Sequence, residues 1–337
     1  MKFIASITED RYRIKEIRKL WDESGDIRNP FASILITPLF TPPSALKLIR
    51  EMQEAGDIGE VYFDSGGYYV QTGQITYEEM YWQLLNFYRQ NDWADYYVLP
   101  DSVPLSSDTT QDVWYKVYKT ANMSSLFFQE MPLSIQERAL PVVQGHSIDQ
   151  IEYCIERYLD LGIQNIGFGS FGTCGKSGSS NTLTTNALAF LNHMVKILFQ
   201  YGKRLHAFGV GTPPVIYLLD KIGVYSFDSV GWMKTAGYGK IYMPFTRAYN
   251  ITYRDPQARG LTEAEFYKLK ELTGHDCIFC RTFDKLAHHR PTRVMHNLAA
   301  ILDTIDFLKC DTSHVPDILA KYSPSYAKLY TEATLWL

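Results

Sequence analysis

The chain of 337 residues has no apolar run long enough to span a membrane, and its first residues lack the apolar stretch of a secretory signal. We therefore expect a cytoplasmic protein without a membrane partner. Cysteine is scarce, since there are only five, an odd number in a chain of this length. Such usage argues against a disulfide framework and favours reduced thiols or a metal site.

Nucleotide-binding signatures are incomplete. Gly167 to Gly172 matches Gly-x-Gly-x-x-Gly, but no Asp or Glu stands between Leu161 and Leu219, where a dinucleotide fold places the acid that binds the ribose. The run from Gly169 through Lys176 misses the Walker A spacing by one residue. These absences exclude both nucleotide-binding interpretations. The chain also has no His-x-His pair, which argues against a zinc amidohydrolase barrel.

The charge of the chain is small but uneven. A net charge of −4 argues against a protein that simply coats nucleic acid. Residues 234–293, however, hold eleven Lys and Arg against six Asp and Glu. A basic region on an acidic body suits a polyanion bound on one face, although a solvated surface would show the same pattern.

Short apolar segments alternate with amphipathic helical patterns along most of the chain. Eight such segments read as strands: Met1–Ile7, Ala32–Pro38, Val61–Asp64, Tyr96–Pro100, Leu140–Gln144, Asn165–Gly169, Leu205–Val210 and Tyr225–Val230. Helical patterns lie between them: Ser44–Ala55, Thr76–Gln90, Ser147–Leu161, Leu188–Tyr201 and Pro214–Ile222. This alternation predicts an irregular (β/α)8 TIM barrel, although an open doubly wound sheet would show it too.

The alternation of strands and helices stops after Val230, where the sequence becomes polar and basic. A Cys/His cluster and one amphipathic helix, Val294–Leu308, follow. We interpret residues 1–337 as a single barrel domain that includes a metal-binding subdomain at about 234–310.

The Cys/His cluster predicts a metal site. His275, Cys277 and Cys280 form His-x-Cys-x-x-Cys, and His296 follows near the start of the last predicted helix. Two thiolates and two imidazoles make a closed tetrahedral set typical of structural Zn²⁺, with no open position for catalysis. His288 and His289 compete with His296 for the fourth place, and two free cysteines with unrelated histidines remain the alternative.

Two aspartates stand where predicted buried strands end. Asp64 opens Asp64-Ser65-Gly66-Gly67, and Asp228 lies in Ser226-Phe227-Asp228-Ser229. A carboxylate at the end of a buried strand is costly unless its charge is used there, although taken singly Asp64 could be a turn former and Asp228 a satisfied acid at a strand end. Asp101 follows a predicted strand, Gln144 ends another, and a barrel keeps its active site at these ends. The pattern therefore predicts a pair of acids in one site.

At these residues the chain resembles the tRNA-guanine transglycosylase superfamily. The similar segments, in family order, are Asp64-Ser65-Gly66-Gly67-Tyr68, Val142-Val143-Gln144-Gly145, Gly209-Val210-Gly211-Thr212-Pro213, Phe227-Asp228 and the Cys-x-x-Cys with His296-Asn297-Leu298. The resemblance covers Asp64 to about Leu298 and implies an exchange of guanine for a 7-deazaguanine base without cleavage of the polynucleotide backbone.

The resemblance also implies roles for individual residues. Asp228 would be the nucleophile that attacks C1′ of the sugar, and Asp64 the general acid and base. The free 7-deazaguanine base would be bound by Ser65, Asp101, Gln144, Gly169, Phe208 and Gly209.

The chain departs from the tRNA enzymes after the nucleophile. Residues 231–239 lack the two arginines of their anticodon-reading segment, and the loop after Gly169 lacks the acid that they place near an aminomethyl group. These departures resemble the DNA-directed branch (DpdA) and favour 7-cyano-7-deazaguanine (preQ0) as the incoming base. DNA would then contact Trp232, Lys234, Tyr238, Arg281, Arg290 and Arg293.

Sequence alone leaves other functions open. A tRNA-guanine transglycosylase with an unusual anticodon reader would use the same chemistry on tRNA. A non-catalytic nucleic-acid-binding subunit with the same fold is a further alternative, against which the presence of both Asp64 and Asp228 argues. Partner proteins of a DNA-modification system would also fit the first interpretation.

Overall fold

The computed structural model describes residues 1–174, 181–252 and 259–334. Gly175 and Lys176, which end the Walker-like run, therefore lie outside the described residues. Among the described helices, none is both long and apolar enough to cross a bilayer.

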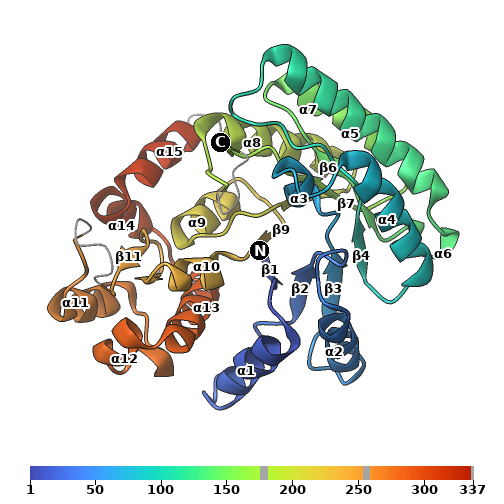
Figure 1. Cartoon of the computed structure of the whole chain (residues 1–337). Coiled ribbons are helices and arrows are strands. Elements are labelled where there is room, and N and C mark those ends of the chain that lie inside the picture. The colour runs from blue at the N-terminus through green and yellow to red at the C-terminus, as the bar shows by residue number, and fades with distance from the viewer. Residues whose placement is uncertain (175–180, 253–258, 335–337) are drawn as a thin grey trace.

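The core of the molecule is a barrel of parallel strands surrounded by helices (Figure 1). The strands are β1 (Lys2–Ser6), β2 (Ser33–Ile36), β3 (Glu60–Phe63), β4 (Tyr96–Val98), β5 (Ala139–Leu140), β6 (Val142–Val143), β7 (Asn165–Phe168), β8 (Arg204–Ala207) and β9 (Ser226–Ser229). Their order is β5-β4-β3-β2-β1-β9-β8-β7-β6.

Pro141 alone separates the two ends of this order, because it stands between β5, which pairs with β4, and β6, which pairs with β7. Proline has no N–H to donate, so the ladder is interrupted there, although its carbonyl still accepts from the Gly167 N–H at 2.8 Å. The nine short strands thus occupy eight positions. This confirms the predicted (β/α)8 barrel and excludes the open sheet.

Helices connect successive strands and cover the outside of the barrel: α1 (Arg11–Asp22), α2 (Pro43–Glu54), α3 (Gly67–Gln71), α4 (Tyr77–Gln90), α5 (Thr110–Glu130), α6 (Leu133–Gln136), α7 (Ile148–Leu159), α8 (Thr185–Gln200) and α9 (Pro213–Lys221). Their starts are encoded locally. Thr76 and Thr109 each form a capping box with the acid three residues on, and α2 and α9 begin with proline.

The chain after β9 builds a group of elements on one side of the barrel (Figure 1). These are α10 (Gly231–Gly237), β10 (Lys240–Ile241), β11 (Tyr249–Asn250), α11 (Glu263–Thr273), η1 (Ile278–Cys280), α12 (Phe283–His288), α13 (Arg290–Phe307), α14 (Val315–Tyr322) and α15 (Pro324–Thr334). A separate small hydrophobic cluster, which includes Met243, Phe266 and Leu286, forms the core of this region. Helix α13 packs against α10 and against the barrel helices α1 and α9, and so attaches the region after β9 to the barrel.

Alternation along the strands decides which side chains enter the barrel. Ile4 and Tyr62 belong to the small cluster inside the barrel, whereas Ala5, Val61 and Phe63 belong to the outer core under the helices. Successive side chains of a strand point to opposite faces, so the residues two positions after Ile4 and Tyr62 also point into the barrel. Ser6 and Asp64 therefore lie at the carboxyl end of the barrel interior.

Candidate active site and metal centre

Three carboxylates meet at the carboxyl ends of the strands, as the sequence predicts. Asp64 follows β3, Asp101 follows β4, and Asp228 lies in β9. The charges of Asp101 and Asp228 both act on Asp64. Tyr88 of α4 helps to align the first two acids, because its hydroxyl lies within hydrogen-bond distance of both carbonyls that end β3 and β4, at 3.1 Å and 2.9 Å.

Asp228 is held by donors on both of its oxygens. The Ser6 hydroxyl donates to Oδ2 at 2.6 Å, and the Gly209 N–H donates to Oδ1 at 2.7 Å. His206 Nε2 lies 3.3 Å from the same Oδ1. Gly209 has φ +65°, a conformation that favours glycine and that turns its N–H toward Asp228. Asp228 is only 4% exposed, and its carboxylate is therefore fixed in one orientation at the barrel mouth.

Asp64 has a different environment. Its Oδ2 accepts from the Thr37 hydroxyl at 2.9 Å and from the Gly66 N–H at 3.3 Å. Burial raises the pKa of Asp64 to about 7; the Thr37 hydrogen bond opposes this shift, and the nearby charges of Asp101 and Asp228 add to it. Near neutral pH the group is thus divided between its acid and its base form, as a residue that both gives and takes a proton requires.

Three of the predicted base-binding residues, Ser65, Asp101 and Gln144, form one buried network. Ser65 donates to Oδ1 of Asp101 at 2.9 Å, and the Gln144 amide donates to Oδ2 at 2.6 Å. The other end of Gln144 accepts from the Ser170 hydroxyl at 2.5 Å. Gly67 leaves room for Asp101, since a Cβ there would lie 2.5 Å from its Oδ1. Burial raises the pKa of Asp101. The hydrogen bonds among these residues hold their polar groups in fixed positions inside the protein.

Phe208 and Gly169 complete the group of predicted substrate residues. The Phe208 ring lies 4.3 Å from the His206 ring, edge to face, and covers Gly167. A Cβ at Gly169 would lie 2.5 Å from the Gln144 amide nitrogen, so the network needs glycine there. The Gly169 N–H is already used in the sheet, where it donates to Val143, but its carbonyl accepts only from Phe171 among the described contacts. That carbonyl keeps a lone pair for a ligand.

Four polar residues of the site were not predicted: Ser6, Thr37, Ser170 and His206. Each lies within or directly beside a predicted strand. The sequence could have identified them as polar residues at positions of an otherwise apolar strand that point into the barrel. This is clearest for His206, which lies two residues before Phe208 and so points the same way.

The predicted nucleic-acid contacts separate into exposed and buried residues. Lys234 of α10 lies over the Tyr68 ring, with Nζ 5.5 Å from the ring centre, and so stands beside the segment that carries Asp64. Tyr238 is 63% exposed, and Arg281 and Arg290 are exposed as well. Lys234 is half-buried, and Arg290 lies 4.0 Å from the Glu9 carboxylate, but all four keep some exposed surface.

Two of the predicted nucleic-acid contacts are wrong. Trp232 is 0% exposed; it packs against Phe31, and its indole N–H donates to the Ser229 carbonyl at 3.1 Å. Arg293 is 1% exposed and donates to the carbonyls of Ala236, Leu286 and Ala287. Both side chains hold the region after β9 together. Neither reaches the surface to contact DNA.

The four predicted metal ligands gather in one place. The ligand atoms of His275, Cys277, Cys280 and His296 all lie within 4.8 Å of one another. Donors around a tetrahedral zinc lie roughly 3 to 4 Å apart, so small adjustments bring this set around one ion. His288 is exposed beside Asp284, and His289 caps α13 through Thr292, which leaves His296 as the fourth ligand.

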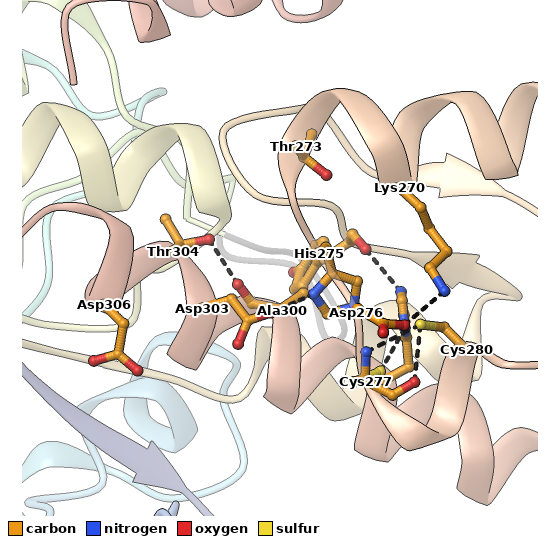
Figure 2. Close-up of polar contacts among 12 residues, drawn as sticks. Lys270, Thr273, His275, Asp276, Cys277, Cys280, Ala300, Asp303, Thr304 and Asp306 are labelled. Carbon is orange, nitrogen blue, oxygen red and sulfur yellow. Dashed lines mark hydrogen bonds and ion pairs between the residues drawn. The ribbon is translucent and has the colours of Figure 1, made fainter. Parts of the chain in front are cut away.

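The partners of the two imidazoles leave one nitrogen of each free for a metal. Figure 2 shows His275 between Asp303 on one side and the two cysteines on the other. His275 Nδ1 lies 2.6 Å from Asp303, and His296 Nε2 lies 2.9 Å from the Tyr242 carbonyl. The remaining nitrogens, His275 Nε2 and His296 Nδ1, are 3.3 Å apart and face the thiols. This is the arrangement by which outer partners orient metal-binding histidines.

The chemistry of the thiols also suits a metal. Hydrogen bonding from Cys277, and then from His275 and His296, lowers the pKa of the Cys280 thiol. A thiolate is the form of cysteine that binds metals. The four residues fit a metal ion, and with four protein donors the site offers structure and no open coordination position.

Comparison with known proteins adds no family to this description. No protein-family model matches the chain, and no curated protein is significantly similar to it. The resemblance to guanine transglycosylases therefore rests on the sequence motifs alone.

Proposed function

We propose that this chain is a DNA-guanine transglycosylase that exchanges guanine for a 7-deazaguanine base, with 7-cyano-7-deazaguanine as the preferred incoming base. The observation that carries the proposal is the pairing of Asp228 with Asp64. One carboxylate is fixed by donors on both oxygens, and the other has a pKa of about 7 in the same space. Acids with divided roles at one site are what base exchange at C1′ requires.

In the first half of the reaction, Asp228 forms a bond to C1′ of the sugar and the bond from C1′ to the departing guanine breaks. Asp64, in its acid form, gives a proton to that guanine. In the second half, the incoming base loses a proton to Asp64 and attacks C1′, and Asp228 leaves as a carboxylate. The two halves balance, so no ATP or redox partner is needed. Phe208 supplies an apolar cover that limits attack by water on the covalent intermediate.

The choice of DNA is supported by the segment after Asp228. Where the tRNA enzymes have arginines that read an anticodon loop, α10 carries Lys234 at the barrel mouth. Tyr238 is the first residue after α10. A base in duplex DNA must leave the stack to reach Asp228, and an exposed tyrosine beside a lysine suits the displaced strand. We propose Zn²⁺ for the Cys/His centre, where it would hold the region after β9 in place.

The test is incorporation of labelled 7-cyano-7-deazaguanine by the purified protein, with duplex DNA and bulk tRNA offered in parallel. We expect label in DNA alone. Label in tRNA alone would mean that the protein carries out the same base exchange on tRNA. Label in neither polymer would favour a non-catalytic binding subunit.

A second measurement tests the mechanism directly. With the incoming base left out, wild-type protein should form an adduct with the polynucleotide that survives denaturing electrophoresis. Asp228→Asn should abolish the adduct and lower exchange by about a thousandfold or more, whereas the surface variant Asp57→Asn should match wild type. Normal exchange by Asp228→Asn would refute the assignment of the nucleophile.

A further inference from the structure

An imidazole lies directly beside the proposed nucleophile, and the two-carboxylate scheme does not use it. His206 is 1% exposed, within β8, and its side chain enters the barrel interior next to Asp228. Its Nε2 lies 3.3 Å from Asp228 Oδ1, and its Nδ1 lies 2.9 Å from the Ser226 hydroxyl. The ring is enclosed by Tyr62, parallel at 6.4 Å, and by Phe208, edge to face at 4.3 Å. It therefore has little freedom to turn.

The hydrogen-bond partners decide which nitrogen of neutral His206 carries the proton. A carboxylate only accepts hydrogen bonds, so Nε2 must be the donor toward Asp228. Nδ1 is then an acceptor, and Ser226 is a suitable partner because a hydroxyl can donate to it. Ser226 and Asp228 lie two residues apart in β9, with the same inward phase, so one strand orients both nitrogens of the ring.

The two oxygens of Asp228 consequently differ. Oδ1 faces two N–H donors, from Gly209 and His206, whereas Oδ2 faces the Ser6 hydroxyl. Two N–H groups directed at one oxygen suit it to become the carbonyl oxygen of an ester, which leaves Oδ2 to form the bond to C1′. When the incoming base displaces the ester, the same N–H groups stabilise the charge that returns to the carboxylate.

We propose that His206 is a positioning residue, which as the Nε2–H tautomer set by Ser226 holds Oδ1 of Asp228 and directs Oδ2 to C1′. This proposal rests on the proposed function, because it concerns the covalent step of base exchange. The proton on Nε2 stays on the imidazole throughout, so His206 adds no step to the proton balance between Asp64 and the two bases.

The kinetic test compares two replacements of the ring. His206→Gln keeps a neutral N–H donor of similar reach, whereas His206→Leu keeps bulk and removes the donor. We expect the rate of adduct formation in His206→Gln to stay within about fivefold of wild type and that in His206→Leu to fall by about 10- to 100-fold, the effect of losing one hydrogen bond to a charged group. His193→Leu, which alters a histidine on α8 outside the site, is the matched control and should not change the rate.

Rates are compared per correctly folded molecule, with the thermal midpoint of each variant measured in parallel. A purely structural role would lower the midpoint of both His206 variants and leave the rate of the folded fraction unchanged. That result would overturn the proposal, as would equal rates in His206→Gln and His206→Leu.

A spectroscopic test is independent of activity. Nitrogen-15 NMR of the imidazoles, with the His206 signals assigned by their loss in His206→Gln, should show that the neutral ring carries its proton on Nε2 and none on Nδ1. Ser226→Ala should shift the Nδ1 signal. An Nδ1–H tautomer would refute the proposal whatever the activity. If the tautomer is as expected but wild-type protein forms no adduct with DNA or tRNA, the proposed function fails, and the positioning role fails with it.

Discussion

Asp64 and Asp228 face the same space, and their local partners give them different properties. Asp228 is fixed by Ser6, Gly209 and His206, whereas the hydrogen bonds to Asp64 among the described residues come from Thr37 and one backbone N–H, against the cost of burial. Environment thus divides two identical side chains into a candidate nucleophile and a candidate proton carrier. The raised pKa of Asp64 also affects the stability of the whole protein.

Replacement of Asp64 should make stability less dependent on pH. A carboxyl whose pKa is higher in the folded protein than in the unfolded chain binds its proton more tightly when folded. The stability that this provides is fully present below the ordinary pKa near 4 and is lost as pH rises toward about 7. Asp64→Asn removes this loss. We therefore expect the variant to gain thermal midpoint relative to wild type at pH 8 and to gain less, or nothing, at pH 4.5.

The measurement is thermal unfolding of both proteins at the two pH values, with Asp57→Asn as a surface control. The same variant should lower base exchange by about 100-fold or more, because a proton carrier is lost. An equal change in midpoint at both pH values would mean that the pKa of Asp64 is not raised in the folded protein.

The sequence identifies the residues at strand ends better than those inside strands or after the barrel. Asp64 and Asp101 could be found because polar residues interrupt apolar runs. His206 lies within such a run, and only the phase of the strand distinguishes it. Trp232 and Arg293 mislead because aromatic and cationic side chains suit nucleic acid, while their burial depends on how α10 and α13 pack together. Local pattern does not contain that information.

At the scale of elements, the site depends on where the strands stop. The predicted strands Val61–Asp64 and Leu205–Val210 end in the structure at Phe63 and Ala207, because the chain turns at residues used by the site. Asp64 then lies beyond the last paired residue of β3, and the left-handed Gly209 turns after β8. Strand existence and order follow from alternating apolar runs, whereas these ends depend on contacts between strands that are distant in sequence.

Helix α13 carries both a metal ligand and the partner of another ligand. His296 and Asp303 are seven residues apart, two helical turns, and so lie on the same face of α13. Asp303 accepts from His275 on one side and from Arg28 on the other, at 2.6 Å and 2.7 Å. Because Arg28 lies between α1 and β2, this chain of contacts joins the metal centre to the barrel.

Asp303→Asn should therefore weaken metal binding. The amide cannot hold the His275 ring as a carboxylate does, and loss of such an outer partner typically lowers metal affinity by about 10- to 100-fold. We expect this change in competition for Zn²⁺ against a chromophoric chelator. Asp306→Asn is the matched control, because Asp306 also contacts Arg28, at 3.2 Å, and is not a partner of His275. Equal affinities in the two variants would show that Asp303 does not orient the ligand.

At the scale of the whole molecule, the region after β9 brings positive charge to the mouth of the barrel. Lys234 lies against Tyr68, and Arg290 lies near the end of α10, where a Cβ at Gly237 would be 3.8 Å from its guanidinium. Both come from the stretch 234–293, in which basic residues exceed acidic ones. Arg293 is one of the basic residues counted in this stretch, but it is buried and adds no charge to the surface. The sequence count is therefore higher than the number of basic residues exposed on this face.

The remaining basic residues at this face should determine how DNA binding depends on salt. Each phosphate contact contributes a slope of about −0.9 to the change of log affinity with log salt concentration. The double variant Lys234→Ala, Arg290→Ala should therefore bind DNA more weakly at low salt and show a slope smaller by about two. The control Lys19→Ala, Lys47→Ala removes the same charge from highly exposed positions on α1 and α2 and should leave the slope unchanged. Fluorescence anisotropy with a labelled duplex between about 50 and 200 mM salt measures both the affinity and the slope.

Equal slopes in the two double variants would show that DNA docks elsewhere, whereas a reduced slope only in the first would place the polymer across the mouth that holds Asp64 and Asp228.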